Sequence, residues 1–101
     1  MALTMEAVIR IEVVTSAHGL PQLCAELSRC GIDHYTIVPG VRGKGERGRQ
    51  DDDDPAGVAG NGYLLTTCTR EQLPRGVEAI REVLRVAGGE CLVSEARRIR
   101  H

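Results

Sequence analysis

Two kinds of hydrophobic pattern alternate along this chain, and their order constrains its fold more than any other feature. Residues 8–15 alternate apolar and mostly polar side chains, which is typical of a half-buried strand. Residues 20–27 instead carry apolar side chains at helical spacing, with Pro21 suited to the first turn of a helix. Gly31 is then placed to end that helix.

Two strands follow without a helix between them. Residues 35–38 are rich in β-branched side chains, and Pro39 and Gly40 then bend or end this second strand. Residues 63–68 form the third strand. We therefore expect the two strands to be joined by a loop.

The second helix is marked at both ends. Thr69 and Gln72 have the spacing of a capping box, in which each side chain binds the backbone N–H of the other residue. Apolar residues recur at helical spacing through residues 73–87, and Gly88 and Gly89 stop the helix.

A last strand at residues 91–96 completes the order β-α-β-β-α-β. The two β-α-β halves of this order can pack as one antiparallel sheet with both helices on one face. This gives an α+β sandwich of the ferredoxin-like arrangement. The 101 residues support one domain, over residues 6–101. The chain has no Trp or Phe, so its core is thin, and thin cores are often completed by oligomerisation.

Composition argues against several functions. The formal net charge of −1 and the scarcity of aromatic residues disfavour nucleic-acid binding. The four cysteines show no Cys-x-x-Cys spacing and the histidines no metal-ligand spacing, so we expect reduced thiols and no metal site. No set of residues suggests catalysis, which favours a binding module over an enzyme. Without a signal sequence or a membrane-spanning stretch, the chain is expected to be cytoplasmic.

The loop between the second and third strands, at about residues 43–62, is unusually long, since a hairpin normally needs about two to five residues. It begins with glycines interleaved with the cations Lys44, Arg47 and Arg49. Glycines let a backbone approach a ligand and cations supply a positive field, so this run is a candidate anion site. Four aspartates at residues 51–54 follow, and we interpret them as a solvated segment, with a divalent-cation site as the alternative. We expect the loop to be mobile without a ligand or partner.

The element order, the long loop and the Gly-Lys-Gly-x-Arg run at its base resemble the PII signalling superfamily, especially its short PII-like branches. Further short matches occur in the family's order at Gly31-Ile32, Thr36-Ile37, residues 77–80, Val93-Ser94 and residues 98–100. The resemblance implies a homotrimer with three clefts between neighbouring subunits, each binding an adenine nucleotide. It also implies that the loop, called the T-loop in the family, reports which ligand is bound.

The resemblance further implies a set of nucleotide-binding residues. The phosphate side at the T-loop base would consist of Gly43, Lys44, Gly45 and Arg47. Thr36 and Thr67 would lie near the nucleoside, and Gly88 and Gly89 would line the cleft. Arg98 and Arg100 would reach the phosphates from the C-terminal end, and as alternate residues of an extended strand they point to one face.

Several residues depart from the family pattern, and these differences limit which nucleotide we expect the protein to bind. Glu90 stands where typical members carry a Lys that meets the distal phosphates, and an acid there repels a triphosphate. The loop also lacks a Gly-Arg-Gln at its base and a tyrosine that could be modified. These differences favour ADP or AMP over ATP. They also favour inorganic-carbon regulation, with bicarbonate as a further candidate ligand and a membrane transporter or carboxysome-related protein as a candidate partner of the T-loop.

Other functions stay open at this point. One is a nitrogen-regulatory PII-type sensor. Others are a ferredoxin-like module for a metal or an amino acid, similar to CutA or ACT modules, and a purely structural oligomer. The long basic loop and the scarcity of metal ligands argue against the metal module, and a response to nucleotide would separate a sensor from a structural protein.

Overall fold

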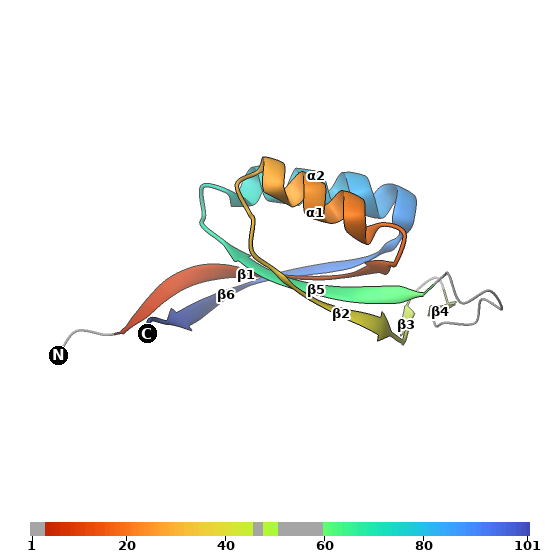
Figure 1. The fold of residues 1–101 in the computed structure, drawn as a ribbon, viewed down its shortest axis with the longest axis horizontal. Helices are drawn as coiled ribbons and strands as arrows, with labels where there is room; N and C mark the ends of the chain where they lie inside the picture. The colour runs from red at the N-terminus through yellow and green to blue at the C-terminus, as the bar shows by residue number, and fades with distance from the viewer. Residues whose placement is uncertain (1–3, 46–47, 51–59) are drawn as a thin grey trace.

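The computed structural model describes residues 4–45, 48–50 and 60–101. Two helices lie side by side on one face of a four-stranded antiparallel sheet with the strand order β2-β5-β1-β6 (Figure 1). This arrangement confirms the predicted β-α-β-β-α-β sandwich. The elements are β1 (Met5–Ser16), α1 (Leu20–Arg29), β2 (Thr36–Val41), β3 (Gly43–Gly45), β4 (Gly48–Gln50), β5 (Asn61–Cys68), α2 (Leu73–Ala87) and β6 (Gly89–Ile99).

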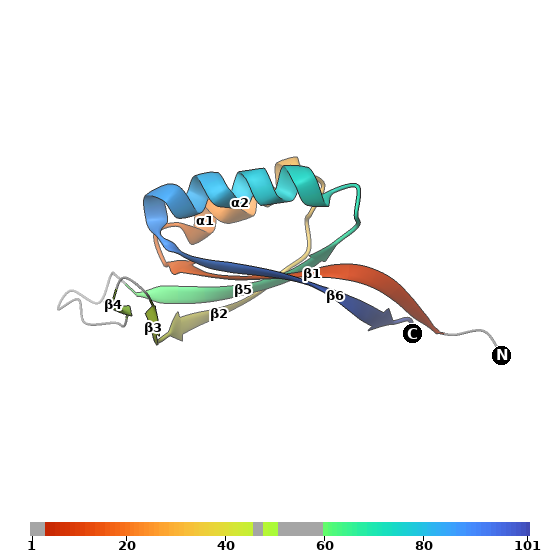
Figure 2. The same cartoon turned by 180° about the vertical axis from the view of Figure 1, so that it is seen from behind.

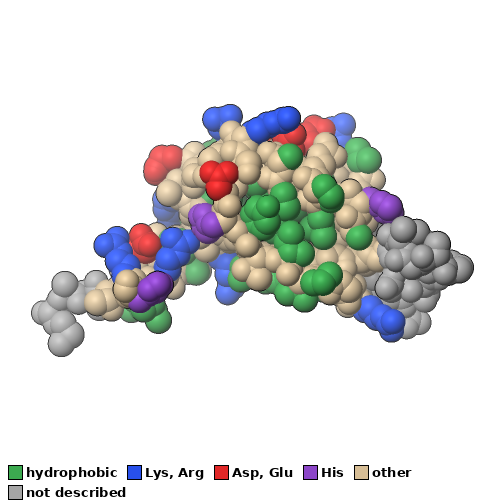
Figure 3. All heavy atoms as spheres, in the orientation of Figure 1, with side chains coloured by type: hydrophobic (Ala, Val, Ile, Leu, Met, Phe, Trp, Pro, Cys, Tyr) green, Lys and Arg blue, Asp and Glu red, His purple; other side chains and the backbone are tan. Residues whose placement is uncertain are grey.

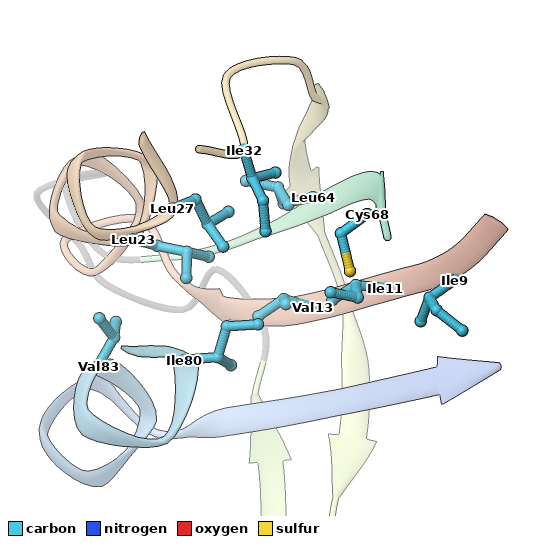
Figure 4. Close-up of a cluster of buried hydrophobic side chains, with 10 residues drawn as sticks. All are labelled: Ile9, Ile11, Val13, Leu23, Leu27, Ile32, Leu64, Cys68, Ile80 and Val83. Atoms are coloured by element: carbon cyan, nitrogen blue, oxygen red, sulfur yellow. The ribbon is translucent and has the colours of Figure 1, made fainter. Parts of the chain in front are cut away.

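The core lies between the sheet and the helices, and aliphatic side chains make up most of it. The predicted alternation in β1 places Ile9, Ile11 and Val13 on the helix side, where all three are buried. Burying one such side chain stabilises the fold by about 1.5–3 kcal/mol. The buried cluster, shown in Figure 4, consists of Ile9, Ile11, Val13, Leu23, Leu27, Ile32, Leu64, Cys68, Ile80 and Val83.

Local backbone signals set the helix ends as predicted. Gly31 has a φ of 82°, and it follows α1 in a motif where the N–H of Ile32 donates to the carbonyl of Leu27 at 2.9 Å. Before α2, the amide of Thr69 donates to Gln72 Oε1 at 2.9 Å. The amide of Gln72 donates in return to Thr69 Oγ1 at 3.2 Å, which completes the capping box.

Strands β1 and β6 are longer than the sequence pattern indicated. They pair without interruption from Met5 opposite Ile99 to Thr15 opposite Gly89, whereas we expected strands at residues 8–15 and 91–96. Backbone pairing continues where the hydrophobic alternation has ended, because the ladder uses only main-chain groups. The two chain ends therefore form a ribbon that extends past the helices, as both views show (Figures 1 and 2).

The second strand and the loop after it also differ from the expectation. β2 continues through Pro39 and Gly40 with a shift in register and ends at Val41, so these two residues bend the strand and do not end it. An edge strand such as β2 tolerates Pro. The start of the predicted loop forms a small hairpin in which Lys44 of β3 lies opposite Arg49 of β4. The predicted aspartate segment at residues 51–54 lies outside the described residues.

Candidate functional site

The sheet brings several of the predicted site residues together at the end of the molecule that carries the chain termini. Arg98 of β6 lies directly opposite Glu6 of β1. Its guanidinium donates to Thr67 Oγ1 on β5 and lies 3.5 Å from His34 Nε2. The His34 ring is in turn 3.1 Å from Thr67 Oγ1. We call Glu6, His34, Thr36, Thr67, Arg98 and Arg100 the terminal half-site.

Thr36 and Arg100 join this group through the strand pairing. Thr36 begins β2 opposite Leu65, which is two positions before Thr67 and so on the same face of the sheet. The amide of Arg100 donates to the carbonyl of Thr4 at 2.7 Å, which fixes the backbone just past β6. The Arg100 guanidinium lies 3.4 Å from Glu6 Oε2. Thr36, Thr67, Arg98 and Arg100 thus lie in one region of the protomer.

An open pocket of about 610 Å³ adjoins the terminal half-site. It lies between the start of β1, the end of β6 and the turn before α2, and Arg70 and Glu95 form an ion pair within its lining. A buried hydroxyl supports one wall, since Thr66 Oγ1 donates to the carbonyl of His34 at 2.5 Å. The pocket therefore combines charged side chains of both signs with a backbone turn that is held from inside the fold.

Two residues of the terminal half-site were missed at the sequence level. His34 was given no role beyond the absence of metal-ligand spacing; it is exposed, and its ring contacts both Thr67 and Arg98. Glu6 was not considered, because its contact with Arg98 depends on the register between β1 and β6. The only available signal was that Glu6 and Arg98 lie near opposite ends of a chain whose first and last strands could pair.

The other predicted residues that the structure describes lie at the end of the molecule that carries β3 and β4, and we call this group the loop half-site. Gly43, Lys44 and Gly45 form β3 at the start of the T-loop. Gly88 and Gly89 form the turn from α2 into β6, with φ angles of 76° and 122°. Arg47, which was predicted to bind phosphate, lies outside the described residues.

The glycine turn of the loop half-site is closely packed against β1. A Cβ on Gly89 would lie 2.0 Å from the carbonyl oxygen of Val14, so no side chain fits there. The buried Thr15 hydroxyl donates to the carbonyl of Gly88 at 2.7 Å. Glu90, the acid that replaces the family's Lys, follows directly in β6 and is exposed. Backbone conformation, more than side-chain contacts, therefore shapes this end.

The two half-sites lie at opposite ends of one protomer (Figures 1 and 2). In β5, Asn61 pairs with residues at the loop end and Thr67 belongs to the terminal half-site. Six positions of extended strand span about 20 Å at ~3.3 Å per residue. A single protomer thus does not bring Lys44 and Arg98 together.

Comparison with known proteins identifies the family. The family model of the nitrogen regulatory protein P-II matches residues 8–101. This chain therefore belongs to the P-II family, which the sequence resemblance had indicated. No curated protein matches the chain in sequence.

Solved structures of PII-like proteins share the fold. The CPII protein of Thiomonas intermedia K12, bound to ADP, AMP and bicarbonate, superposes with a TM-score of 0.86 at 18% identity, covering 98% of this chain and 94% of that one. A PII-like signalling protein from Thermus thermophilus gives 0.74 at 19% identity, covering 96% and 94%. The GlnK–ATP complex of B. subtilis gives 0.65 at 18% identity, covering 95% and 85%. At these identities the likeness shows the fold.

Two further features of the described residues concern metal binding and membrane insertion. The described residues contain no group of three or more His, Cys, Asp or Glu side chains arranged to hold a metal ion. In the same part of the chain, neither helix has the length and apolar character needed to cross a bilayer.

Proposed function

We propose that this protein is a PII-like regulator that binds an adenine nucleotide in clefts between the subunits of a homotrimer. Each cleft would combine the terminal half-site of one protomer with the loop half-site of the next. The observation that carries the proposal is the position of two cationic half-sites at opposite ends of one protomer. A head-to-tail contact that closes into a ring joins such ends, whereas a two-fold contact joins identical surfaces.

The exposed apolar side chains support an oligomer. The sheet face opposite the helices carries Leu92 of β6, which is 57% exposed, and Val38 of β2. Ile99 at the tip of the β1–β6 ribbon is 67% exposed. Apolar side chains also gather on the face where α1 and β2 lie (Figure 3), and exposed Tyr35 and Ile37 belong to this region. Large apolar side chains exposed on several faces of a small protomer are consistent with burial against neighbouring subunits.

Polar groups on the sheet face opposite the helices pair with one another within the protomer. They would give specificity to the contact between subunits. Arg10 Nε lies 3.2 Å from Glu12 Oε1, and the Tyr63 hydroxyl donates to Glu12 Oε2 at 3.0 Å. Burial and this hydrogen bond raise the pKa of Tyr63 above its ordinary value, so the hydroxyl stays a donor at neutral pH.

The chemistry of the two half-sites suits a small phosphorylated ligand. Guanidinium groups such as those of Arg98 and Arg100 bind phosphate oxygens through paired N–H donors. The glycine-rich backbone at the loop half-site allows close approach, and Thr36 and Thr67 offer hydroxyls to a nucleoside. Glu90 beside the glycine turn disfavours a long polyphosphate, so ADP or AMP is preferred over ATP. The T. intermedia relative bound to ADP, AMP and bicarbonate supports this choice.

The protein would act by switching and not by catalysis. A ligand that contacts the T-loop base favours one loop conformation over others, and the loop then permits or blocks docking on a partner. Because the relative from T. intermedia also holds bicarbonate, we place this switch in inorganic-carbon regulation, with a membrane transporter or carboxysome-related protein as the partner. Nitrogen control through ATP is the alternative, and Glu90 argues against it.

Mixed oligomers test whether each cleft uses two protomers. One variant carries Lys44→Ala and Arg47→Ala, the other Arg98→Ala and Arg100→Ala, and each alone should bind ADP about 100-fold more weakly because charged contacts are lost. After the two variants are unfolded, mixed and refolded together, about one cleft in four should regain normal affinity in titration calorimetry. A chain with all four substitutions, treated alone, is the control.

Two results would contradict the proposal. Recovery of no high-affinity clefts in the mixture, although mixed oligomers form, would mean that each site lies within one protomer. Failure of the unmodified protein to bind AMP, ADP or ATP would remove the nucleotide from the proposal altogether.

A further inference from the structure

Glu6 is the one acidic side chain among the described residues that lies within ion-pair distance of Arg98 or Arg100. Its two carboxylate oxygens contact different arginines. Oε1 lies 3.4 Å from Arg98 Nη1, and Oε2 lies 3.4 Å from Arg100 Nη2. One carboxylate thus bridges both guanidinium groups that the proposed site offers to a phosphate.

The strand register sets this arrangement. Glu6 and Arg98 are directly opposite each other in the β1–β6 ladder, so their side chains project from the same face at neighbouring positions. Arg100 lies two positions beyond Arg98, and alternate residues of an extended chain share a face. The hydrogen bond from the Arg100 amide to Thr4 keeps the chain in register past the end of β6.

The contacts are loose enough for an external anion to replace them. Both N···O distances of 3.4 Å exceed the 2.7–2.9 Å or so of a strong charge-assisted hydrogen bond. The Glu6 side chain is 35% exposed and that of Arg98 is 43% exposed, so water competes with the pair. Exposed pairs of this kind are individually weak. Arg98 is meanwhile kept in place by Thr67, which does not depend on Glu6.

We propose that Glu6 is an internal counter-ion that occupies the phosphate-binding guanidinium groups of Arg98 and Arg100 until an anionic ligand displaces it. The nature of that ligand, a nucleotide phosphate, rests on the proposed function. Glu6 lowers the affinity of the site for anions, because the ligand must break two ion pairs and approach a fixed negative charge. Glu6 thereby raises the ligand concentration that is needed to fill the site. It affects only the binding of the charged group of the ligand.

Glu6→Gln tests this role, since glutamine keeps the size of the side chain and removes its charge. Binding of inorganic pyrophosphate, AMP, ADP, adenosine and bicarbonate is measured by titration calorimetry on the unmodified protein and the variant. Pyrophosphate, AMP and ADP should bind about two- to tenfold more tightly to the variant at low salt. This gain should shrink at high ionic strength. The affinity for adenosine, which carries no charge, should not change.

Two matched variants control the measurement. Glu78→Gln removes a carboxylate that pairs with Arg81 on the exposed face of α2, and it should leave all affinities unchanged. Adding Glu6→Gln to the Arg98→Ala and Arg100→Ala variant should give a smaller gain, because the ion pairs of Glu6 are gone and only its repulsion of the ligand remains. Equal melting temperatures of Glu6→Gln and the unmodified protein, within about 2 °C, show that the fold is kept.

The outcomes separate this inference from the proposed function. Tighter pyrophosphate binding by Glu6→Gln without any nucleotide binding supports the counter-ion role and contradicts the nucleotide proposal. Tighter binding of both pyrophosphate and bicarbonate, again without nucleotide binding, supports the counter-ion role and identifies a small anion as the ligand. Unchanged or weaker pyrophosphate binding means that Glu6 does not compete, and weaker binding would show that it positions the arginines. Absence of pyrophosphate binding to both proteins at millimolar concentration also overturns the inference.

Discussion

The two ends of the protomer build their half-sites from different parts of the chain. At the terminal end, side chains on β1, β5 and β6 meet because the strand register aligns them, and Glu6, Thr67 and Arg98 are all in contact with a neighbour. At the loop end, the shape comes from backbone conformation, with two glycines at positive φ packed against β1. The difference teaches that substitutions of the charged side chains at the terminal end should change affinity, whereas substitutions in the glycine turn of the loop end should change stability.

The sharpest test of this contrast is Gly89→Ala. The new methyl group would overlap the carbonyl of Val14, and the φ of 122° is unfavourable for any L-residue. We expect a loss of roughly 2–4 kcal/mol in the free energy of unfolding. Urea denaturation at one fixed protein concentration measures this loss, since dissociation of an oligomer contributes to apparent stability.

Gly40→Ala is the matched control for this substitution. Gly40 also has a positive φ, of 69°, but nothing lies within 4 Å of its added Cβ. Only the conformational penalty remains, and we expect a loss of about 1 kcal/mol. Equal losses for the two variants would show that the close approach to Val14 is not what shapes the loop end.

A buried threonine supports each end, and removing its hydroxyl should have a smaller effect. Thr15→Val leaves the carbonyl of Gly88 without its partner, and Thr66→Val does the same to the carbonyl of His34. Each should cost about 1–2 kcal/mol in the free energy of unfolding, because valine matches the shape and only the hydrogen bond is lost. Thermal and urea unfolding of both variants checks this.

The two threonine variants should also differ in their effects on ligand binding. Thr66→Val loosens the turn that carries His34 and should weaken ADP binding, while Thr15→Val should shift the loop half-site. Thr4→Ser, at the exposed start of the ribbon, is a neutral comparison for stability. No loss of stability in either valine variant would mean that these hydroxyls do not hold the site turns.

The smallest expected effect concerns the ionisation of Cys68. This thiol is 5% exposed beside the terminal pocket, and burial raises its pKa above the ordinary value of 9.0. Its alkylation rate, followed residue by residue with mass spectrometry, should therefore have a pH midpoint above 9. A midpoint below that value would show that the arginines of the terminal end act on the thiol more strongly than burial does.

The same pKa shift has a defined effect on stability. Because the folded-state pKa is raised, the unfolded chain loses this proton more readily than the folded chain does. The contribution to stability is complete below the unfolded-state pKa and is lost as the pH rises through the folded-state pKa. An unfolding free energy that does not fall as the pH rises above about 8.5 would contradict the assignment.

Periodicity was enough to predict the elements that bury a face. The alternation around Ile11, the helical stripes and the capping box of Thr69 and Gln72 all have local signals, and the structure confirms them. Contacts set by register have no such signal. The pairing of Glu6 with Arg98 joins the first and last strands, and nothing in either segment specifies their alignment.

The structure brings together only part of the predicted set of site residues. Arg98 and Thr67 are in contact, but Lys44 lies at the far end of the protomer. His34 was missed because an isolated histidine carries no pattern of its own. Only the sheet, which places it beside Thr67, shows its neighbours.

Strand β6 begins with Gly89 at the loop end and finishes next to Arg98 at the terminal end. In the proposed ring, one continuous strand would therefore have its first residue in one cleft and its last in the adjacent cleft. A small shift of β6 at one of its ends would therefore move residues that contact the ligand in the adjacent cleft. Ligand binding at one cleft would then change the affinity of the next, so the three clefts of the ring would not fill independently.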